Sequence, residues 1–205
     1  MDTHKSTARN PEAIFSEIYQ NGLWSTTKWN SGTGSDPSKE GSPYGFLVPA
    51  LIKTLEAKTV VDLGCGDGRI LASLAVDCPG VTFHGLDCCS HLINHLRNVL
   101  PHHHWHHNQL TTLHDFDQIP DADVYLCKDV FHHWPTANII NLVQYLQCQQ
   151  MGVMIATQDR YQDEKTTDCE MGGYRALSGA MKPWSLFQPE LLANYLHKAV
   201  WLLRF

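Results

Sequence analysis

The sequence contains no apolar run that approaches the roughly 20 residues a helix needs to cross a bilayer. Charge is also scarce, since only 18% of the 205 residues are charged. Lys and Arg number 15 against 21 Asp and Glu, which gives a formal net charge of -6. Proteins that hold phosphate backbones need a basic face, so this balance disfavours nucleic acid as a partner. The first residues show no apolar core after their charges, so we expect no signal peptide.

Cysteine is present seven times, an odd number, and no pair is spaced as C-x-x-C. This pattern predicts reduced thiols in a cytoplasmic protein rather than a disulfide framework or a zinc site. Hydrophobic residues make up 43% of the chain, too many for a disordered protein. A chain of this length suits one domain that buries roughly 70% of its unfolded surface.

We divide this single domain into an N-terminal helix and cap within 1–44, a core over 45–160, and an acceptor loop with closing strands over 161–205. The first helix is expected after Asn10, which can cap it, and before Gly22. A Gly- and Ser-rich segment with two tryptophans follows. Their large apolar surfaces favour a lid over a ligand rather than a flexible linker.

From residue 46 onward, short β-rich runs alternate with helical patterns. Helices are expected near 46–57, 68–77, 90–99 and 136–148, and strands near 58–63, 81–86, 103–108, 122–127 and 152–158, with two closing strands in 191–205. Such alternation predicts an α/β fold with a mostly parallel sheet that helices cover on both faces.

The most informative run is VVDLGCGDGRI, in which a buried strand ends in Gly64, Gly66 and Gly68 and opens into a helix. Such a turn lets a ligand approach the backbone at the carboxyl edge of the sheet. Asp62 and Asp67 flank the turn, and two carboxylates would repel a pyrophosphate while they suit a cationic ligand. The spacing also departs from the dinucleotide and P-loop motifs.

Asp87 closes the second strand, 19 positions after Gly68, where an acidic residue can accept hydrogen bonds from a ribose diol. A nucleoside with positive charge in place of phosphates is S-adenosylmethionine (SAM). At VVDLGCGDG, LDCC and ADVYLCKDVFHHW the sequence resembles the class I SAM-dependent methyltransferases, over about residues 45–160. The resemblance implies a seven-stranded sheet with an antiparallel C-terminal strand, and SAM as the cofactor.

The resemblance also implies a set of cofactor residues. Residues of the glycine turn would line the methionine end of SAM. Asp87 would bind the ribose, and Cys88 would pack beside the adenine. Gln109 stands where the family often has an Asp near the adenine amino group, and Asp115 is the competing candidate. The complete set of cofactor residues is Asp62, Gly64, Cys65, Gly66, Asp87, Cys88, Gln109, Leu110 and Lys128.

The candidate catalytic residues follow the fourth strand, beside the expected cofactor. Asp129, His132 and His133 are titratable there, and an Asp beside a His can orient it as a general base for an alcohol acceptor. His132 has a structural alternative as a packed histidine at the helix start. The run also lacks the N/D-P-P-Y/F pattern of methyltransferases that act on base amines, which again disfavours nucleic acid.

The acceptor prediction comes from two flanking segments, SGTGS and CEMGGYRALSGAMKPWSLFQP. They are similar to those of a small group of methyltransferases that we connect with carbohydrate or small polar acceptors. Tyr174, Trp184 and Phe187 could stack on a sugar, and Gln158 and Arg175 could bind its hydroxyls. The alternative for Trp184 and Phe187 is that they cover the sheet edge.

The run HHHWHH at 102–107 invites a metal interpretation. On a strand these histidines would face alternate sides of the sheet, and the sequence offers them no clear carboxylate or thiolate partner. We therefore expect exposed strand histidines and no metal site.

The sequence therefore predicts a SAM-dependent O-methyltransferase for a hydroxyl of a small polar acceptor, with a sugar or glycan as the candidate. Two other classes stay open: a non-catalytic methyltransferase-like partner domain, and a nicotinamide-dependent oxidoreductase that the acidic turn disfavours. The chain could also be one module of a longer polypeptide, for example one fused to a glycosyltransferase.

Overall fold

The computed structural model describes residues 10–25, 27, 29–38, 42–163 and 165–205. The prediction about a signal peptide and parts of the predicted cap fall on residues outside this set. Within the described residues, none of the helices has both the length and the apolar character that a membrane crossing requires.

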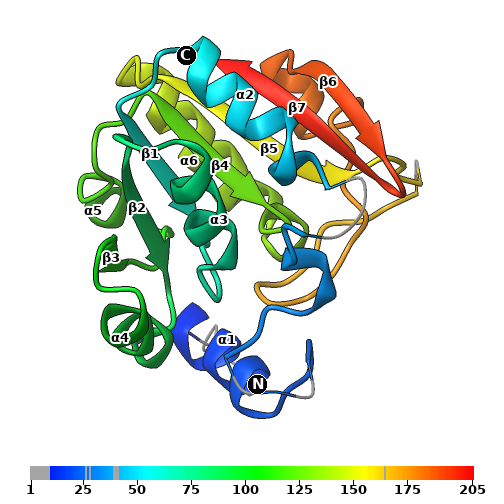
Figure 1. Cartoon of the computed structure of the whole chain (residues 1–205). Helices are drawn as coiled ribbons and strands as arrows, with labels where there is room; N and C mark the ends of the chain where they lie inside the picture. The colour runs from blue at the N-terminus through cyan, green and yellow to red at the C-terminus, as the bar shows by residue number, and fades with distance from the viewer. Residues whose placement is uncertain (1–9, 26, 28, 39–41, 164) are drawn as a thin grey trace.

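The described strands form one seven-stranded sheet in the order β3-β2-β1-β4-β5-β7-β6 (Figure 1). The strands are β1 Thr59–Leu63, β2 Thr82–Asp87, β3 His104–His107, β4 Val124–Lys128, β5 Val153–Asp159, β6 Glu190–Tyr195 and β7 Lys198–Arg204. The first five run parallel, and β7 inserts antiparallel between β5 and β6. This arrangement confirms the predicted fold class.

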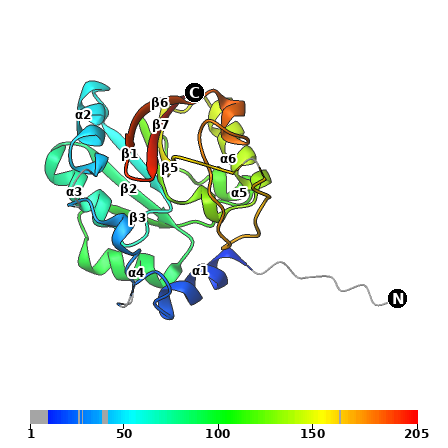
Figure 2. The same ribbon diagram turned by 90° about the vertical axis from the view of Figure 1, so that its right-hand side faces the viewer.

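Helices cover both faces of the sheet, and Figure 2 shows them on either side of the strands seen nearly end-on. They are α1 Pro11–Gln20, α2 Leu47–Thr54, α3 Arg69–Asp77, α4 Ser90–Val99, α5 Leu113–Phe116 and α6 Thr136–Cys148. One apolar core lies between the sheet and α2, α3 and α4, and a second lies between the sheet and α5 and α6. Two buried cores explain why the inner strands read as continuous apolar runs rather than as alternating ones.

The sheet brings the ends of distant chain segments to one edge. Leu63 at the end of β1 pairs with Leu86, one residue before Asp87 ends β2. Lys128 ends β4 opposite Thr157 of β5. Because parallel strands end at the same edge, the chain that leaves β1, β2, β4 and β5 meets in one place, where open α/β folds bind ligands.

Helix α1 begins as predicted, because the Asn10 side chain accepts a hydrogen bond from the Glu12 N–H at 2.9 Å. Helix α5 was not predicted. It is a single turn held by a capping box, in which the Thr112 hydroxyl and the Asp115 carboxylate each accept the other's backbone N–H. The cap also lowers the pKa of Asp115: burial opposes this, but hydrogen bonds from Thr111 and Thr112 outweigh it. Asp115 therefore caps the start of this helix.

Candidate active site

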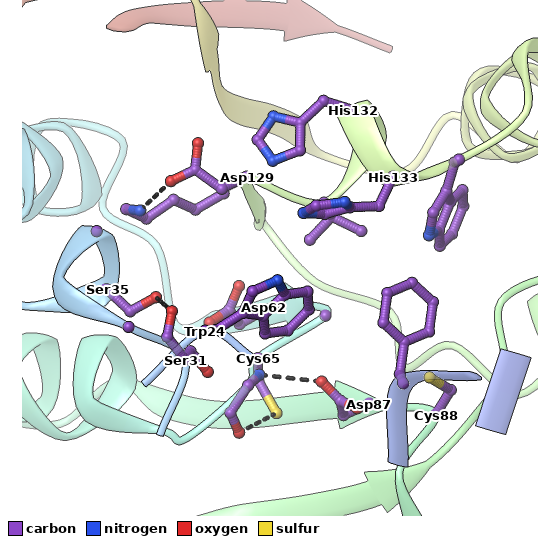
Figure 3. A pocket seen from close by; sticks show the side chains of 18 of the residues that line it. Trp24, Ser31, Ser35, Asp62, Cys65, Asp87, Cys88, Asp129, His132 and His133 are labelled. Carbon is purple, nitrogen blue, oxygen red and sulfur yellow. Dashed lines mark hydrogen bonds and ion pairs between the residues drawn. The ribbon is translucent and has the colours of Figure 1, made fainter. Parts of the chain in front are cut away.

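A pocket of about 570 Å³ opens at the carboxyl edge of the sheet, and residues of α1 also line it. Figure 3 shows side chains of this pocket from close by. Its lining comes from the glycine turn, the ends of β2 and β4, the chain around residues 108–110, and the N-terminal segment. All nine predicted cofactor residues and all three predicted catalytic residues line it. The sheet thus brings together residues that lie as much as 71 positions apart in the sequence, from Asp62 to His133.

The glycine turn needs glycine for two separate reasons. Gly64 and Gly66 have φ values of 75° and 53°, in the left-handed region that L side chains rarely adopt. A Cβ atom at Gly64 would also lie 2.5 Å from the Val130 side chain, and one at Gly66 would lie 2.3 Å from Ser31 Oγ. Any side chain at either position would therefore displace the chain that closes the pocket.

Two carboxyl groups face the pocket beside this turn. Asp87 accepts hydrogen bonds from the Gly66 N–H at 3.1 Å and the Cys89 N–H at 3.0 Å, through different oxygens. Each oxygen keeps a further lone pair for a ligand. Burial raises the pKa of Asp87 and raises that of Asp62 to about 7, although the nearby Lys128 ammonium acts to lower the latter. A cationic ligand would relieve the cost of these buried charges.

Asp67 does not face the pocket as the sequence argument assumed. Its carboxylate lies 2.8 Å from an Arg69 guanidinium nitrogen and accepts the Ser31 N–H at 2.8 Å. Asp67 thus ties the glycine turn to the N-terminal segment. The acidic character of the pocket comes from Asp62 and Asp87 instead.

The N-terminal segment packs onto the glycine turn. Ser31 Oγ accepts the Asp67 N–H at 3.0 Å and lies 2.9 Å from the Tyr19 hydroxyl. Trp24 lines the pocket, whereas Trp29 packs against the core and near His91. Both tryptophans pack against apolar residues, as expected, but of the two only Trp24 lines the pocket.

At the opposite rim, Gln109 and Leu110 line the pocket next to Cys88. Leu110 has a φ of 55°, and its N–H donates to the Asn108 side chain at 2.8 Å. Sequence reasoning missed Asn108, which is buried, lines the pocket and holds this turn. A buried Asn directly after an edge strand was the available signal.

A network of charges lies beyond the end of β4. Asp129 contacts the Lys128 ammonium, and Lys198 Nζ lies 2.9 Å from both Asp129 Oδ1 and Asp159 Oδ1. Burial alone would raise the pKa of Asp129, but the ammonium groups of Lys128 and Lys198 lower it below its ordinary value. Asp129 also has a φ of 56°, unusual outside glycine, so the backbone is held in a strained conformation at this point.

The two histidines have partners other than the one expected. Asp129 was predicted to orient a histidine, but His132 Nδ1 lies 3.5 Å from Asp159 Oδ2. His133 Nδ1 lies 2.6 Å from the Gly173 carbonyl oxygen. Because a carbonyl only accepts, His133 Nδ1 carries the proton and Nε2 carries the lone pair. Burial, with a contribution from His132, lowers the pKa of His133 to about 4.

Asp159 and Lys198 are functional candidates that the sequence argument missed. Each carried a signal: Asp159 ends a buried strand at the ligand edge, and Lys198 begins the apolar run of β7. The pairing of β5 with β7 places Asp159 opposite Lys198. That pairing cannot be read from local sequence, since 39 positions separate the two residues.

Three of the four predicted acceptor residues do not line the pocket that the described residues form. Gln158 is fully buried in β5. The Arg175 guanidinium donates to the Trp134 carbonyl oxygen at 3.0 Å and pairs with Asp168. Trp184 is buried, with its ring 5.1 Å from that of Phe131. The Arg175 side chain supports the loop, and Trp184 belongs to the second apolar core.

Tyr174, the fourth predicted acceptor residue, lines the pocket. In the same loop, Gly172 and Arg175 donate their N–H groups to the carbonyl oxygens of His133 and His132 at 2.8 and 3.0 Å, respectively. The Tyr174 ring is 6.0 Å from the His133 ring. The GGYR element thus positions both the histidines and one aromatic wall.

The last four residues of the histidine run form the edge strand β3, His104–His107, with Trp105 buried in the core. His84 of β2 stacks on His104 at 4.7 Å between ring centroids, and its Nδ1 lies 3.0 Å from His106 Nε2. Burial lowers the pKa of His84 to about 4. His107 instead contacts the Cys88 carbonyl oxygen and Glu12, at 3.0 and 3.5 Å.

Comparison with known proteins agrees with this geometry. Residues 61–148 match a family model described as a methyltransferase domain. None of the curated proteins compared with the chain matches it by sequence. Human N-acetylserotonin methyltransferase, solved in complex with SAM, superposes with a TM-score of 0.61 at 14% identity, over 80% of this chain and 52% of that one.

Two further solved structures are similar. The mitomycin 7-O-methyltransferase MmcR gives a TM-score of 0.60 at 18% identity, over 79% of this chain and 53% of that one. A putative O-methyltransferase from Nostoc punctiforme gives a TM-score of 0.62 at 15% identity, over 98% of this chain and 74% of that one. The chain spans about half the length of the first two proteins.

The sheet order, the acidic glycine turn and the family match define a class I methyltransferase fold. More narrowly, residues 61–148 match the family model described as a methyltransferase domain. Both results confirm the resemblance stated from the sequence. At these low identities the solved structures show the fold alone.

Proposed function

We propose that this chain is a SAM-dependent O-methyltransferase for a hydroxyl group of a small polar acceptor. The observation that carries the proposal is the composition of one pocket: two buried carboxyl groups lie beside the glycine turn, and a neutral histidine lies in the same pocket beyond β4. The first feature suits a cationic nucleoside, and the second suits an alcohol that must lose a proton.

The cofactor residues fit SAM. When bound, SAM supplies an electrophilic methyl group on a sulfonium sulfur. Asp87 offers two oxygens with free lone pairs for a ribose diol, and Asp62 offers negative charge for the ammonium group. Gln109 can accept from an adenine amino group through its amide oxygen. The structures of N-acetylserotonin methyltransferase with SAM and of PigF with S-adenosylhomocysteine support this choice.

His133 is the general base in this proposal. Its Nδ1–H is directed to the Gly173 carbonyl oxygen, which fixes the tautomer with a lone pair on Nε2. A base must lie within hydrogen-bond reach of the acceptor hydroxyl, so the acceptor binds between His133 and the methyl group. Asp129 and His132 position this region through Lys198 and Asp159.

Aromatic rings support a sugar or another small ring as the acceptor. The Trp24 and His133 ring centroids are 5.3 Å apart, and the Phe15 and His133 centroids 6.3 Å apart. Tyr174 adds an exposed ring to the same wall. Flat apolar surfaces of this kind stack on the apolar face of a sugar, whose hydroxyl then points to His133.

The cytoplasm is our proposed location. All seven cysteines are free thiols in the structure, including the adjacent Cys88 and Cys89. Paired cysteines would be expected in an oxidising compartment, so the free thiols support a reducing one.

The test is a transfer assay with SAM labelled in its methyl group. The wild-type chain and the His133→Ala variant are incubated with panels of sugars, phenols and amines. We expect label on a hydroxyl acceptor with the wild type and almost none with the variant. Label on amines alone would refute O-methylation. Cofactor binding without transfer to any acceptor would favour the non-catalytic partner domain.

A further inference from the structure

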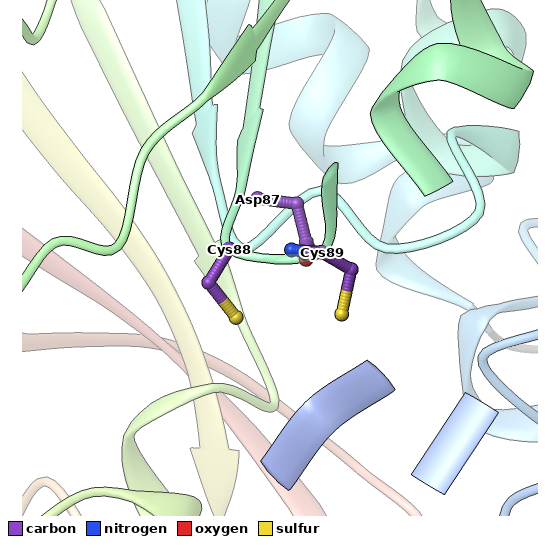
Figure 4. Close-up of side chains that lie close together, drawn as sticks. All are labelled: Asp87, Cys88 and Cys89. Atoms are coloured by element: carbon purple, nitrogen blue, oxygen red, sulfur yellow. Dashed lines mark hydrogen bonds between the residues drawn. The ribbon is translucent and has the colours of Figure 1, made fainter. Parts of the chain in front are cut away.

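Two cysteines directly follow Asp87 at the carboxyl end of β2 (Figure 4). One carboxylate oxygen of Asp87 and the two sulfur atoms all lie within 4.8 Å of one another. Cys89 is buried, whereas Cys88 is half-buried and lines the pocket. The proposed function uses Asp87 and leaves both thiols without a chemical task.

Two thiolates and a carboxylate are a donor set suited to Zn²⁺ and Cd²⁺, with room for water as a fourth ligand. The surrounding charge favours a cation, because Asp62 and Asp87 both line this pocket. Lys128 also lines the pocket, and Asp129 engages its ammonium group. A metal ion has a route to the site, since Cys88 borders the open pocket.

We propose that Asp87, Cys88 and Cys89 form a binding site for a thiophilic divalent cation, and that this cation and the cofactor exclude one another. The exclusion rests on the proposed function, because it requires the cofactor ribose to bind Asp87. On binding, each thiol releases its proton to solvent and forms a sulfur–metal bond, while Asp87 contributes a carboxylate oxygen. Two protons leave, and no electron is transferred.

The proton cost selects which cations can bind. Cys89 is buried and Cys88 is half-buried, so each thiol gives up its proton only to a cation that forms a strong bond to sulfur. A cation must therefore bind thiolate strongly enough to displace that proton, which Cd²⁺ and Zn²⁺ do and Mg²⁺ does not. The site thus discriminates against the abundant hard cations.

The first experiment titrates the full chain with Cd²⁺ alone and follows the ultraviolet charge-transfer band of cadmium thiolate. This band reports sulfur ligands only, so the histidines of β3 do not contribute to it. We expect one equivalent in the wild type, and an affinity lower by at least about 10-fold in Cys88→Ser. Cys148→Ser is the matched control, because Cys148 is exposed at the end of α6.

The control should bind as the wild type does. A wild type without the band, or a band equally strong in Cys88→Ser, would overturn the site. Cys88 is the residue to change first, because it is half-buried and its replacement by serine keeps the side-chain shape. Should Cys89→Ser fail to fold, the comparison of Cys88→Ser with Cys148→Ser decides the matter alone.

The second experiment measures the Kd of S-adenosylhomocysteine at rising Cd²⁺ concentration. We expect this Kd to increase with Cd²⁺ in the wild type and to stay constant in Cys88→Ser. A constant Kd in the wild type would overturn the exclusion. Absence of S-adenosylhomocysteine binding without any metal would instead refute the proposed function, while the cadmium band would still establish the metal site.

Discussion

The two ends of the pocket differ in how the chain builds them. The cofactor end comes mostly from one stretch of sequence, from Asp62 to Cys89, in which two neighbouring strands and their turns follow one another. The acceptor end takes Phe15 from α1, Asp129 from the β4 exit, and Lys198 from β7. A site built from adjacent strands can be predicted from local motifs, whereas one built from distant segments depends on the complete topology.

The cofactor end should be the more sensitive to a single change. Asp87→Ala removes the proposed ribose ligand and also leaves the Gly66 and Cys89 N–H groups without their acceptor. We expect the affinity for S-adenosylhomocysteine to fall by at least about 100-fold, the equivalent of about 3 kcal/mol. Calorimetric titration measures it, with circular dichroism to verify the fold. Wild-type affinity in the variant would remove Asp87 from the cofactor site.

A substitution at the acceptor end should lower turnover without weakening cofactor binding. His133→Ala deletes the proposed base, so kcat should fall by about 100-fold or more, while the Kd for S-adenosylhomocysteine changes little. Since the pKa of His133 is about 4, the wild-type imidazole stays neutral down to that pH, and the acid limb of kcat should lie near it. Turnover that persists in His133→Ala would discard the base assignment.

The charge network at the acceptor end should matter for stability. Lys198→Met leaves Asp159 and Asp129 without their shared ammonium group. Removing one partner of a buried ion pair costs about 3 kcal/mol. Urea denaturation measures the free energy of unfolding, and Lys53→Met, on the α2 surface, is the control. Equal midpoints for Lys198→Met and the control would show that the network does not stabilise the fold.

The smallest expected effect is a pH dependence at the cofactor end. The pKa of Asp62 rises from its ordinary value to about 7 on burial, so the folded chain binds more protons than the unfolded chain between about pH 4 and 7. The contribution of the Asp62 carboxyl to the free energy of unfolding is therefore present at low pH and is lost as the pH rises through about 7. The melting temperature should therefore decrease less between pH 5 and pH 8 in Asp62→Asn than in the wild type. Thermal unfolding at the two pH values measures this difference. An identical loss in both proteins would mean that Asp62 ionises freely.

The same contrast explains what sequence alone could predict. The alternation of strands and helices was sufficient for the fold, and helix α6 lies over the predicted residues, because buried strands and capped helices carry local signals. Asp67 shows the limit of such prediction even at the cofactor end. The sequence places Asp67 correctly at the glycine turn, but it does not show that Arg69 and Ser31 bind its carboxylate. At the acceptor end, Arg175 has the chemistry of a ligand yet holds the Trp134 carbonyl oxygen, a contact across 41 positions.

The most direct measurement compares two ligands on the wild-type chain by calorimetry: S-adenosylhomocysteine, which carries an ammonium group and no phosphate, and NADH, which carries a pyrophosphate. Because Asp62 and Asp87 place negative charge in the pocket, we predict one equivalent of S-adenosylhomocysteine bound and no binding of NADH. Binding of NADH in the absence of any heat with S-adenosylhomocysteine would contradict the proposal that these two carboxyl groups select a cationic nucleoside.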